Sequence, residues 1–317
     1  MLIRPAMREY RTWSLDSRRW ASFQPRPDDI IIATSPKCGT TWMQQIVGSL
    51  IFQNAEPREF PKVSPWIDQR FAGSTEETYA LLEAQAHRRF IKTHLPIDGL
   101  PLYDEIRYVF VARDGRDVAL SAHNHFSGNS PATLATFDRI GLEDPVIGRP
   151  YPRLPADPAE YFRVWISTSA VHGQSDGLPT PSFFEFVSGY WAERQRPNVL
   201  LVHYADLSVD LEGEMRRIAA FLRIDVDDAL WPTLVAAARF EAMKAVGPTL
   251  MPRVAAQLVG GADRFFDKGV TGRWRGVLSD ADLALYDAKV REKFSPTLAR
   301  WVEGGRAAIG DPRTRLD

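Results

Sequence analysis

"TSPKCGTTW", residues 34–42, directly follows the apolar run "DIIIA" at residues 29–33. The apolar run predicts a buried strand, and the Gly and Thr residues after it predict a tight turn into a helix. Such a turn presents unpaired backbone N–H groups and the positive end of the helix dipole to an anion. Unlike a Walker loop, G-x-x-x-x-G-K-[ST], the stretch has its lysine, Lys37, before its only glycine, Gly39. We therefore expect a short anion-binding loop that does not wrap a triphosphate.

Short apolar runs alternate with amphipathic stretches along the chain. The runs are nearly continuous in apolar residues, which is typical of strands buried on both faces of a parallel sheet. They predict strands at Asp29–Thr34, Arg89–Thr93, Arg107–Ala112 and Val199–His203. The amphipathic stretches predict helices at Thr40–Gln53, Gly115–His123, Ser182–Glu193, Leu211–Leu222 and Asp280–Phe294. This alternation predicts an α/β fold with a central parallel sheet flanked by helices.

Two long segments interrupt the alternation. Residues 127–181 are rich in Gly, Pro, Ser and Thr with little periodicity, and residues 245–271 are similarly loop-like. Long irregular segments in a compact domain are usually binding loops or lids, so we expect these two to cover the substrate. No internal repeat and no shift in composition marks a boundary, which predicts a single domain over residues 1–317.

The composition limits the class of protein. The 317 residues are 44% hydrophobic and 25% charged, which is ordinary for a globular enzyme. The formal net charge of −1 argues against a protein that coats nucleic acid or an anionic membrane. The single cysteine, Cys38, suits a reducing compartment, and no apolar run has the length of a membrane span or the pattern of a secretion signal. We expect a cytoplasmic enzyme that is a monomer or a dimer.

A second anion site is predicted where "VARDGRDVALS", residues 111–121, passes from a strand into a helix. Arg113 stands at the carboxyl end of the strand, where α/β sheets bind ligands. Ser121 lies two helical turns further on, so a guanidinium and a hydroxyl could hold one phosphate between them. The alternative is that Arg113 pairs with Asp114 or Asp117 on the surface.

Four motifs, in this order and spacing, resemble the cytosolic sulfotransferase family: "SPKCGTTW", "IKTHLP", "VARDGRDVALS" and "DKGVTGRWR". The resemblance covers residues 29–275. It implies a P-loop-like α/β fold and the donor 3′-phosphoadenosine-5′-phosphosulfate, from which a sulfuryl group passes to a hydroxyl or an amine. The short loop would then hold the 5′-phosphosulfate of this donor, and adenosine 3′,5′-bisphosphate would be the product.

The resemblance also implies the catalytic residues. Lys37 would stabilise the leaving bisphosphate at the oxygen that bridges phosphorus and sulfur, and Lys92 would stabilise the transferring group. His94 would be the general base, because a histidine with a pKa of about 6.5 can take a proton from a hydroxyl at neutral pH. The amides of the loop, with Cys38 in place of the family's serine, would bind the 5′-phosphate together with Gly39, Thr40 and Thr41.

By the same resemblance, the 3′-phosphate would contact Arg113 and Ser121, with Lys268 and the amide of Gly269 closing over it. One position departs from the family pattern, because Asp267 stands where the family has an arginine. Either Arg264 or Arg273 substitutes for that arginine, or Asp267 turns outward and the affinity for the donor drops.

The adenine would lie between Trp42 and Phe240, with a hydrogen bond from Tyr204. Phe240 belongs to "ARFEAMK", which resembles a family segment that also contains Met243 and in which Arg239 replaces a serine. Without the resemblance, Phe240 and Met243 fit a helix-packing stripe equally well.

Three further expectations complete the prediction. His123 and His125 lie two positions apart without a third ligand of suitable spacing, so we expect no metal. The acceptor should be a small molecule, a phenol or an alcohol, in a pocket bounded by aromatic residues of the 127–181 segment (Tyr151, Tyr161, Phe162 and Trp165) and by Phe71 and Tyr79. The family's dimer motif should fall on "RGVLSDADLA" at residues 275–284, which departs from it, so any dimer should use another surface.

Two other functions stay open at this point. A small-molecule kinase on a P-loop core is disfavoured because the chain has no G-K-[ST] loop and no magnesium-binding aspartate that can be placed. A nucleotide-binding module without activity is favoured only by Asp267, while Lys37, Lys92 and His94 argue against it.

Overall fold

Four parallel strands form the central sheet in the order β3–β2–β5–β6. The computed structural model describes residues 1–317. The strands are β2 (Ile30–Thr34), β3 (Phe90–Thr93), β5 (Arg107–Ala112) and β6 (Val199–His203). In register, Ile31 of β2 faces Ile91 of β3 on one side and Tyr108 of β5 on the other. All four predicted strands and their parallel pairing are confirmed.

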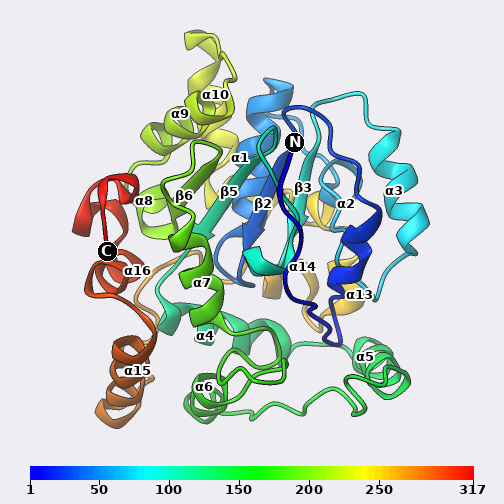
Figure 1. Cartoon of the computed structure of the whole chain (residues 1–317), viewed down its shortest axis with the longest axis vertical. Helices are drawn as coiled ribbons and strands as arrows, with labels where there is room; N and C mark the ends of the chain where they lie inside the picture. The colour runs from blue at the N-terminus through cyan, green and yellow to red at the C-terminus, as the bar shows by residue number, and fades with distance from the viewer.

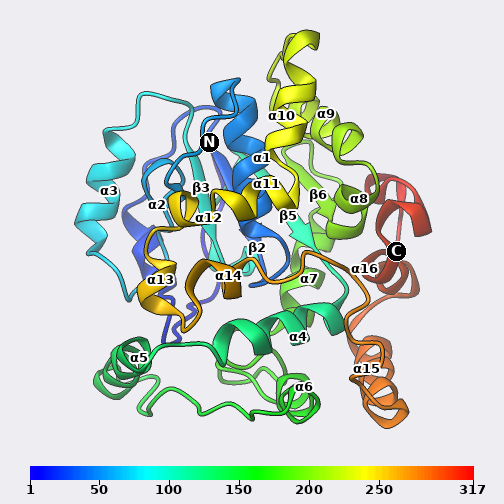
Figure 2. The same ribbon diagram turned by 180° about the vertical axis from the view of Figure 1, so that it is seen from behind.

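Alternate residues of each strand pack on opposite faces of the sheet. Ile30 and Ile32 join a cluster formed with helices α1 (Thr40–Phe52), α9 (Leu211–Leu222) and α10 (Trp231–Ala237). Ile31 and Ala33 join a larger cluster formed with α7 (Phe183–Ala192), α16 (Pro296–Ile309) and the N-terminal segment. Figure 1 is viewed from the face covered by α7 and the N-terminal segment, and Figure 2 from the face covered by α1 and α10. The sheet is therefore covered on both sides, which explains the continuous apolar runs in its strands.

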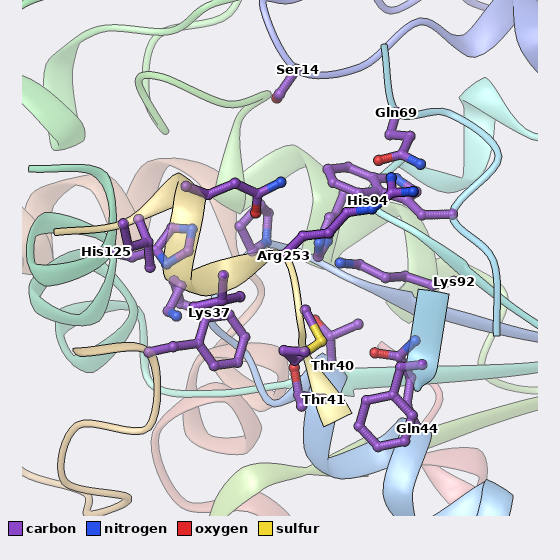
Figure 3. Close-up of a pocket in the computed structure, with 18 of the residues that line it drawn as sticks. Ser14, Lys37, Thr40, Thr41, Gln44, Gln69, Lys92, His94, His125 and Arg253 are labelled. Atoms are coloured by element: carbon purple, nitrogen blue, oxygen red, sulfur yellow. The ribbon is translucent and has the colours of Figure 1, made fainter. Parts of the chain in front are cut away.

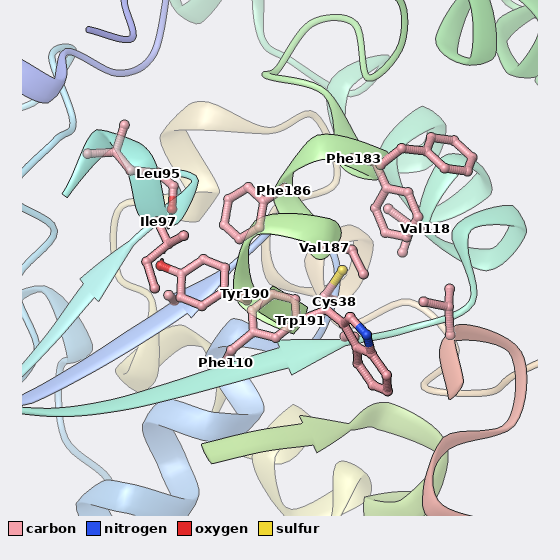
Figure 4. Packing of buried hydrophobic residues seen from close by; sticks show 14 of the residues in the cluster. Cys38, Leu95, Ile97, Phe110, Val118, Phe183, Phe186, Val187, Tyr190 and Trp191 are labelled. Atoms are coloured by element: carbon pink, nitrogen blue, oxygen red, sulfur yellow. Dashed lines mark hydrogen bonds between the residues drawn. The ribbon is translucent and has the colours of Figure 1, made fainter. Parts of the chain in front are cut away.

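Stacked aromatic rings form the centre of the larger cluster. Phe110 of β5 stacks on Tyr190 of α7 with ring centroids 4.5 Å apart and planes 4° apart, and Phe186 packs beside both. Figure 4 shows these rings together with Cys38, whose side chain enters the same cluster.

The other elements surround this core. The remaining helices are α2 (Phe60–Val63), α3 (Thr75–Glu83), α4 (Gly115–Phe126), α5 (Pro131–Glu143), α6 (Pro158–Ser167), α8 (Tyr204–Val209), α11 (Phe240–Ala245), α12 (Gly247–Leu250), α13 (Val254–Gln257), α14 (Gly261–Phe265) and α15 (Asp280–Lys293). A small antiparallel pair joins β1 (Leu2–Arg4) to β4 (Leu102–Tyr103). None of the helices combines the length and the apolar composition needed to span a bilayer.

The two segments expected to be irregular contain helices. Residues 127–181 include α5 and α6, and residues 245–271 include α12, α13 and α14. Two of the prolines that suggested loops, Pro131 and Pro158, stand instead in the first turns of α5 and α6, after the N-caps Ser130 and Asp157. Proline is well tolerated there because the missing N–H would have no partner inside the helix. Helices α4, α5 and α6 gather at one end of the molecule in both views (Figures 1 and 2).

Candidate active site

A cavity of about 520 Å³ lies at the carboxyl edge of the sheet. Each of the four strands ends beside it, because Lys37 follows β2, His94 follows β3, Arg113 follows β5 and Tyr204 follows β6, and all four residues line the cavity. Figure 3 shows Lys37 on one side of this cavity and Lys92 with His94 on the other. The parallel sheet therefore brings together residues that are far apart in the sequence.

The loop before α1 has the conformation of an anion site. Lys37 and Gly39 have positive φ angles of 73° and 109°, and α1 begins at Thr40. A Cβ on Gly39 would lie 3.1 Å from the ring of Tyr204, so the close approach favours glycine. The amides of Gly39, Thr40 and Thr41 have no backbone acceptor. These free N–H groups and the positive end of α1 point to an anionic ligand.

The lysine of this loop is a cation without a close counter-ion. The Lys37 Nζ lies 4.9 Å from the ring centroid of Phe265 and forms no ion pair within the protein. Burial, together with the positive charges of Arg113 and Lys92, lowers the pKa of Lys37 to about 7. A bound anion would favour the charged form of this side chain.

A second lysine stands at the end of β3. The Lys92 Nζ lies 4.2 Å from the ring centroid of Trp66. Burial lowers the pKa of Lys92 to about 8, although the carboxylate of Asp68 acts in the opposite direction. Two lysines thus face one cavity from neighbouring strands.

The histidine two residues later is held in one tautomer. The Nδ1 of His94 lies 2.8 Å from the carbonyl oxygen of Thr34, which can only accept, so Nδ1 carries the proton and Nε2 keeps a free lone pair. Burial, and then the charge of Lys92, hold the pKa of His94 well below its usual value. The expected value near 6.5 is therefore wrong for this environment. At neutral pH the imidazole is uncharged and can accept a proton.

The second anion site is built from the end of β5 and from α4. Arg113 is buried, donates to the carbonyl oxygens of Lys37 (3.3 Å) and Val270 (2.8 Å), and lies 4.2 Å from the ring centroid of Tyr204. Its Nε is buried without a partner. Ser121 of α4 lines the same cavity.

The alternative surface pairing of Arg113 is wrong. Asp114 pairs with Arg116 at 2.7 Å, and Asp117 accepts from the backbone amides of Gly272 (2.7 Å) and Arg273 (2.8 Å). Arg113 therefore pairs with neither acid, and Asp117 anchors the motif at residues 267–275 to α4.

The negative charge of Asp267, which stands where the family has an arginine, is neutralised by an arginine of the same motif. Asp267 forms an ion pair with Arg273 at 2.7 Å, and both line the cavity. Arg264 is engaged elsewhere, because its Nε donates to the carbonyl oxygen of Asn124. Lys268 is exposed at the cavity, and Gly269 has a φ of 66°; a Cβ there would meet the ring of Phe240 at 2.5 Å.

The three aromatic residues predicted to hold the adenine all line the cavity. Trp42, Tyr204 and Phe240 line the cavity, and the indole of Trp42 donates to the carbonyl oxygen of Ala238 at 2.7 Å. Met243 also lines the cavity but is almost fully buried. Arg239 is exposed and is not among the residues that line the cavity, and the thiol of Cys38 points into the core.

The expected aromatic wall for the acceptor is largely wrong. Phe71 lines the cavity, but five of the six aromatic residues named for this role do not: Tyr79, Tyr151, Tyr161, Phe162 and Trp165. The last four are buried in hydrophobic clusters instead. The cavity meets other residues that sequence reasoning did not select for the site, among them Trp66, Gln69, His125, Phe137 and Phe265.

These additional residues carry no motif in the sequence. Trp66 and Gln69 lie in a stretch between predicted helix and strand, and His125 was considered only as a metal ligand. Burial, and then the charge of Lys37, hold the pKa of His125 well below its usual value. No group of three or more His, Cys, Asp or Glu residues is arranged to hold a metal ion.

Comparison with known proteins identifies the family. The sequence matches the family model described as Sulfotransferase domain over residues 27–297. Glycolipid sulfotransferases of Mycobacterium bovis and Mycobacterium tuberculosis are 32% and 33% identical to it, with 94% of both chains covered in each case. Sulfotransferase 1B1 of Mus musculus is 28% identical over 90% of this chain and 89% of its own. The chain therefore belongs to the sulfotransferase family and is a sulfotransferase.

Solved structures agree with this fold. Mouse sulfotransferase SULT7A1, in complex with PAP, has a TM-score of 0.66 at 21% identity, covering 91% of this chain and 93% of its own. Retinol dehydratase, in complex with androsterone and PAP, has a TM-score of 0.65 at 23% identity, covering 87% and 83%. The predicted P-loop-like fold is confirmed.

Proposed function

We propose that this sulfotransferase transfers a sulfuryl group from 3′-phosphoadenosine-5′-phosphosulfate to a hydroxyl group of a small molecule, with His94 as general base. One observation carries the proposal: Lys37, Lys92 and the free Nε2 edge of His94 belong to one cavity that also contains Arg113. Two lysines for the dianionic phosphosulfate group and a neutral base for a hydroxyl are the groups that this reaction requires.

The residues of the cavity fit the donor in three places. The free amides of the loop before α1 suit the 5′-phosphosulfate. The guanidinium of Arg113, which forms no ion pair, and the hydroxyl of Ser121 suit the 3′-phosphate, with Lys268 at the rim. The aromatic rings of Trp42 and Phe240 would hold the adenine.

The proposed step is an in-line displacement at sulfur. His94 Nε2 takes the proton of the acceptor hydroxyl while the acceptor oxygen forms its bond to sulfur. The bond from sulfur to the bridging oxygen breaks, and Lys37 stabilises the charge that develops on that oxygen. Lys92 stabilises the sulfuryl oxygens during the transfer.

The acceptor is proposed to be an alcohol or a phenol with an apolar body. Phe71 and Phe137 give the cavity an apolar wall, and Gln69 adds a polar group that forms no hydrogen bond through its side chain. The mycobacterial relatives are named as glycolipid sulfotransferases, and glycolipids are amphiphiles of this general type.

Two measurements test the proposal together. Isothermal titration should give tighter binding of adenosine 3′,5′-bisphosphate than of ATP. A transfer assay with sulfur-labelled donor and a panel of phenols, alkanols and alkyl glycosides should give at least one labelled product. Preference for ATP would favour a kinase, and donor binding without transfer to any acceptor would favour a nucleotide-binding module.

A further inference from the structure

A fully buried carboxylate lies behind the two groups proposed for catalysis at the end of β3. Asp68 has no exposed surface and forms no ion pair. Its Oδ1 accepts from the indole of Trp20 at 3.2 Å. Its Oδ2 accepts from the indole of Trp66 at 2.6 Å and from the backbone amide of His94 at 3.2 Å. The Oδ2 atom of Asp68 therefore links the backbone of His94, the proposed base, to the side chain of Trp66.

That tryptophan contacts both proposed catalytic side chains. The ring of Trp66 lies under the Lys92 Nζ, 4.2 Å from its centroid, and meets the imidazole of His94 edge-on at 4.9 Å with an interplanar angle of 88°. The amide of Lys92 also donates to the carbonyl oxygen of Pro65 at 2.9 Å. The segment that carries Trp66 and Asp68 is thus bound along β3.

We propose that Asp68 is a positioning residue, which fixes Trp66 and the backbone of His94 so that Lys92 and His94 face the cavity in productive geometry. The inference rests on the proposed roles of Lys92 and His94. Asp68 itself does not touch the reacting atoms, and it acts through Trp66 and through the amide of His94.

The chemistry of the site favours a carboxylate over an amide. Both oxygens of Asp68 are acceptors, and the groups that reach them are donors: the N–H groups of Trp20, Trp66 and His94, together with the Thr93 hydroxyl. An asparagine would offer one acceptor oxygen and would point its own N–H groups at a donor. Removing the carboxylate should therefore release Trp66 or the backbone of His94, and small displacements at an active site cost large factors in rate.

Asp68 also supplies the negative charge that acts on Lys92. The other ionisable groups of this cavity include Lys37, His94 and His125, with Arg253, Glu77 and Asp267 further along the wall. Burial raises the pKa of Asp68, but Asp68 is the one charge that shifts the pKa of Lys92. Neutralising Asp68 should therefore lower the pKa of Lys92, so that Lys92 loses its proton at a lower pH.

The test compares Asp68→Asn with Trp66→Phe and with a matched control, Asp176→Asn. Asp176 is also fully buried and satisfied by hydrogen bonds, from Ser182 Oγ at 2.7 Å and from the amide of Phe184 at 3.3 Å, but it does not line the cavity. Each variant is measured for kcat against pH, for the KM of the donor, for binding of adenosine 3′,5′-bisphosphate, and for Tm.

Asp68→Asn should lower kcat by about 10²-fold, the scale of a misplaced catalytic group. It should also move the alkaline limb of the kcat profile to lower pH by roughly one unit, the scale of a lost opposite charge. Trp66→Phe keeps the charge of Asp68, so it should lower kcat without moving that limb. Bisphosphate binding should be unchanged in both variants. Asp176→Asn should lower Tm and leave both kcat and the limb unchanged.

Three results would overturn the inference. The first is an Asp68→Asn enzyme with the kcat and the pH profile of the wild type. The second is an Asp176→Asn enzyme that loses as much kcat as Asp68→Asn, which would indicate general destabilisation. The third result applies if Asp68→Asn does not fold: a Trp66→Phe enzyme with the kcat of the wild type would then overturn the inference. A wild-type enzyme that transfers no sulfate would instead overturn the proposed function, and this inference with it.

Discussion

A single hydrogen bond decides what His94 can do. Because Nδ1 donates to the carbonyl oxygen of Thr34, the lone pair of Nε2 is fixed on the other edge of the ring. Burial and the positive charge of Lys92 then keep the ring neutral. The same environment that makes the imidazole a weaker base keeps it unprotonated over a wide range of pH.

His94→Ala should lower kcat by about 10²–10⁴-fold, the usual range for a lost general base. His94→Gln should keep acceptor binding without restoring turnover. The base is active when unprotonated, so wild-type kcat/KM should fall as the pH decreases through the pKa of His94 in the free enzyme. Because that pKa is lowered, the acid limb should lie below pH 6.5. Steady-state kinetics over pH 4–8 checks this, with the exposed His172→Ala as control. A fully active His94→Ala enzyme would contradict the mechanism.

Lys37→Met should lower kcat far more than it weakens donor binding, because the contact of Lys37 strengthens as charge develops on the bridging oxygen. In the free enzyme Lys37 is active when protonated and has a pKa of about 7, so wild-type kcat/KM should decrease as the pH rises above 7. A bound anionic donor raises this pKa, so the same limb in kcat should lie at higher pH.

Rapid-quench transfer and bisphosphate titration separate these two effects. Lys62→Met, at an exposed lysine on α2, is the matched control. A Lys37→Met enzyme with kcat within a few-fold of the wild type would show that another group stabilises the leaving oxygen.

At the scale of elements, the junction of β5 with α4 carries the residues proposed to bind the 3′-phosphate of the donor. Arg113 leaves the carboxyl end of the strand, and α4 then places Ser121 at the same cavity. Asp117, in the first turn of α4, accepts from the amides of Gly272 and Arg273 and so fixes the motif that would close over the 3′-phosphate. Strand, helix and loop are therefore coupled at the proposed phosphate site.

Arg113→Ala should remove the preference for a 3′-phosphorylated nucleotide over its 3′-hydroxyl analogue, because Arg113 lines the cavity without an ion pair and is the cation proposed for that phosphate. The loss of a charge-assisted hydrogen bond is worth about 1.5–3 kcal/mol, or roughly 10–100-fold in affinity. Titration with adenosine 3′,5′-bisphosphate and with AMP measures the preference, and Arg139→Ala on the exposed face of α5 is the control. If the preference is unchanged in Arg113→Ala, Lys268 becomes the assigned residue.

At the scale of the whole molecule, residues 275–284, which depart from the family's dimer motif, make contacts within their own chain. Ser279 and Asp282 form a capping box at the start of α15, and Asp282 accepts from the Nε of Arg163 on α6 at 2.7 Å. Leu278 is buried. Residues 278–282 are therefore occupied by contacts within the chain.

Any dimer of this enzyme should therefore leave residues 277–283 outside its interface. Val277→Arg changes an exposed position and should not alter the mass measured by light scattering. Cysteine introduced at residue 277 should give no disulfide-linked dimer, with Cys38 buried and unable to interfere. Cross-linking through residue 277, or a dimer that dissociates in Val277→Arg, would refute this expectation.

Prediction from the sequence succeeded where the signal was local. The four strands and helices α1, α4, α7, α9 and α15 were located to within a few residues, because buried parallel strands are continuous apolar runs and the helices have clear starts. The helices of residues 127–181 were missed because proline in a first helical turn resembles a loop in composition.

The sequence by itself determined the class of this protein and the groups that its reaction requires. The order of strands and motifs placed Lys37, Lys92, His94 and Arg113 at the carboxyl ends of parallel strands, which must meet at one edge. The tertiary structure alone decided how these groups behave. The tautomer of His94, the ion pair of Asp267 with Arg273, and the contact of Asp68 with Trp66 and His94 join residues distant in sequence. Burial and neighbouring charges set the pKa values of the titrating groups, and both arise only when the chain folds.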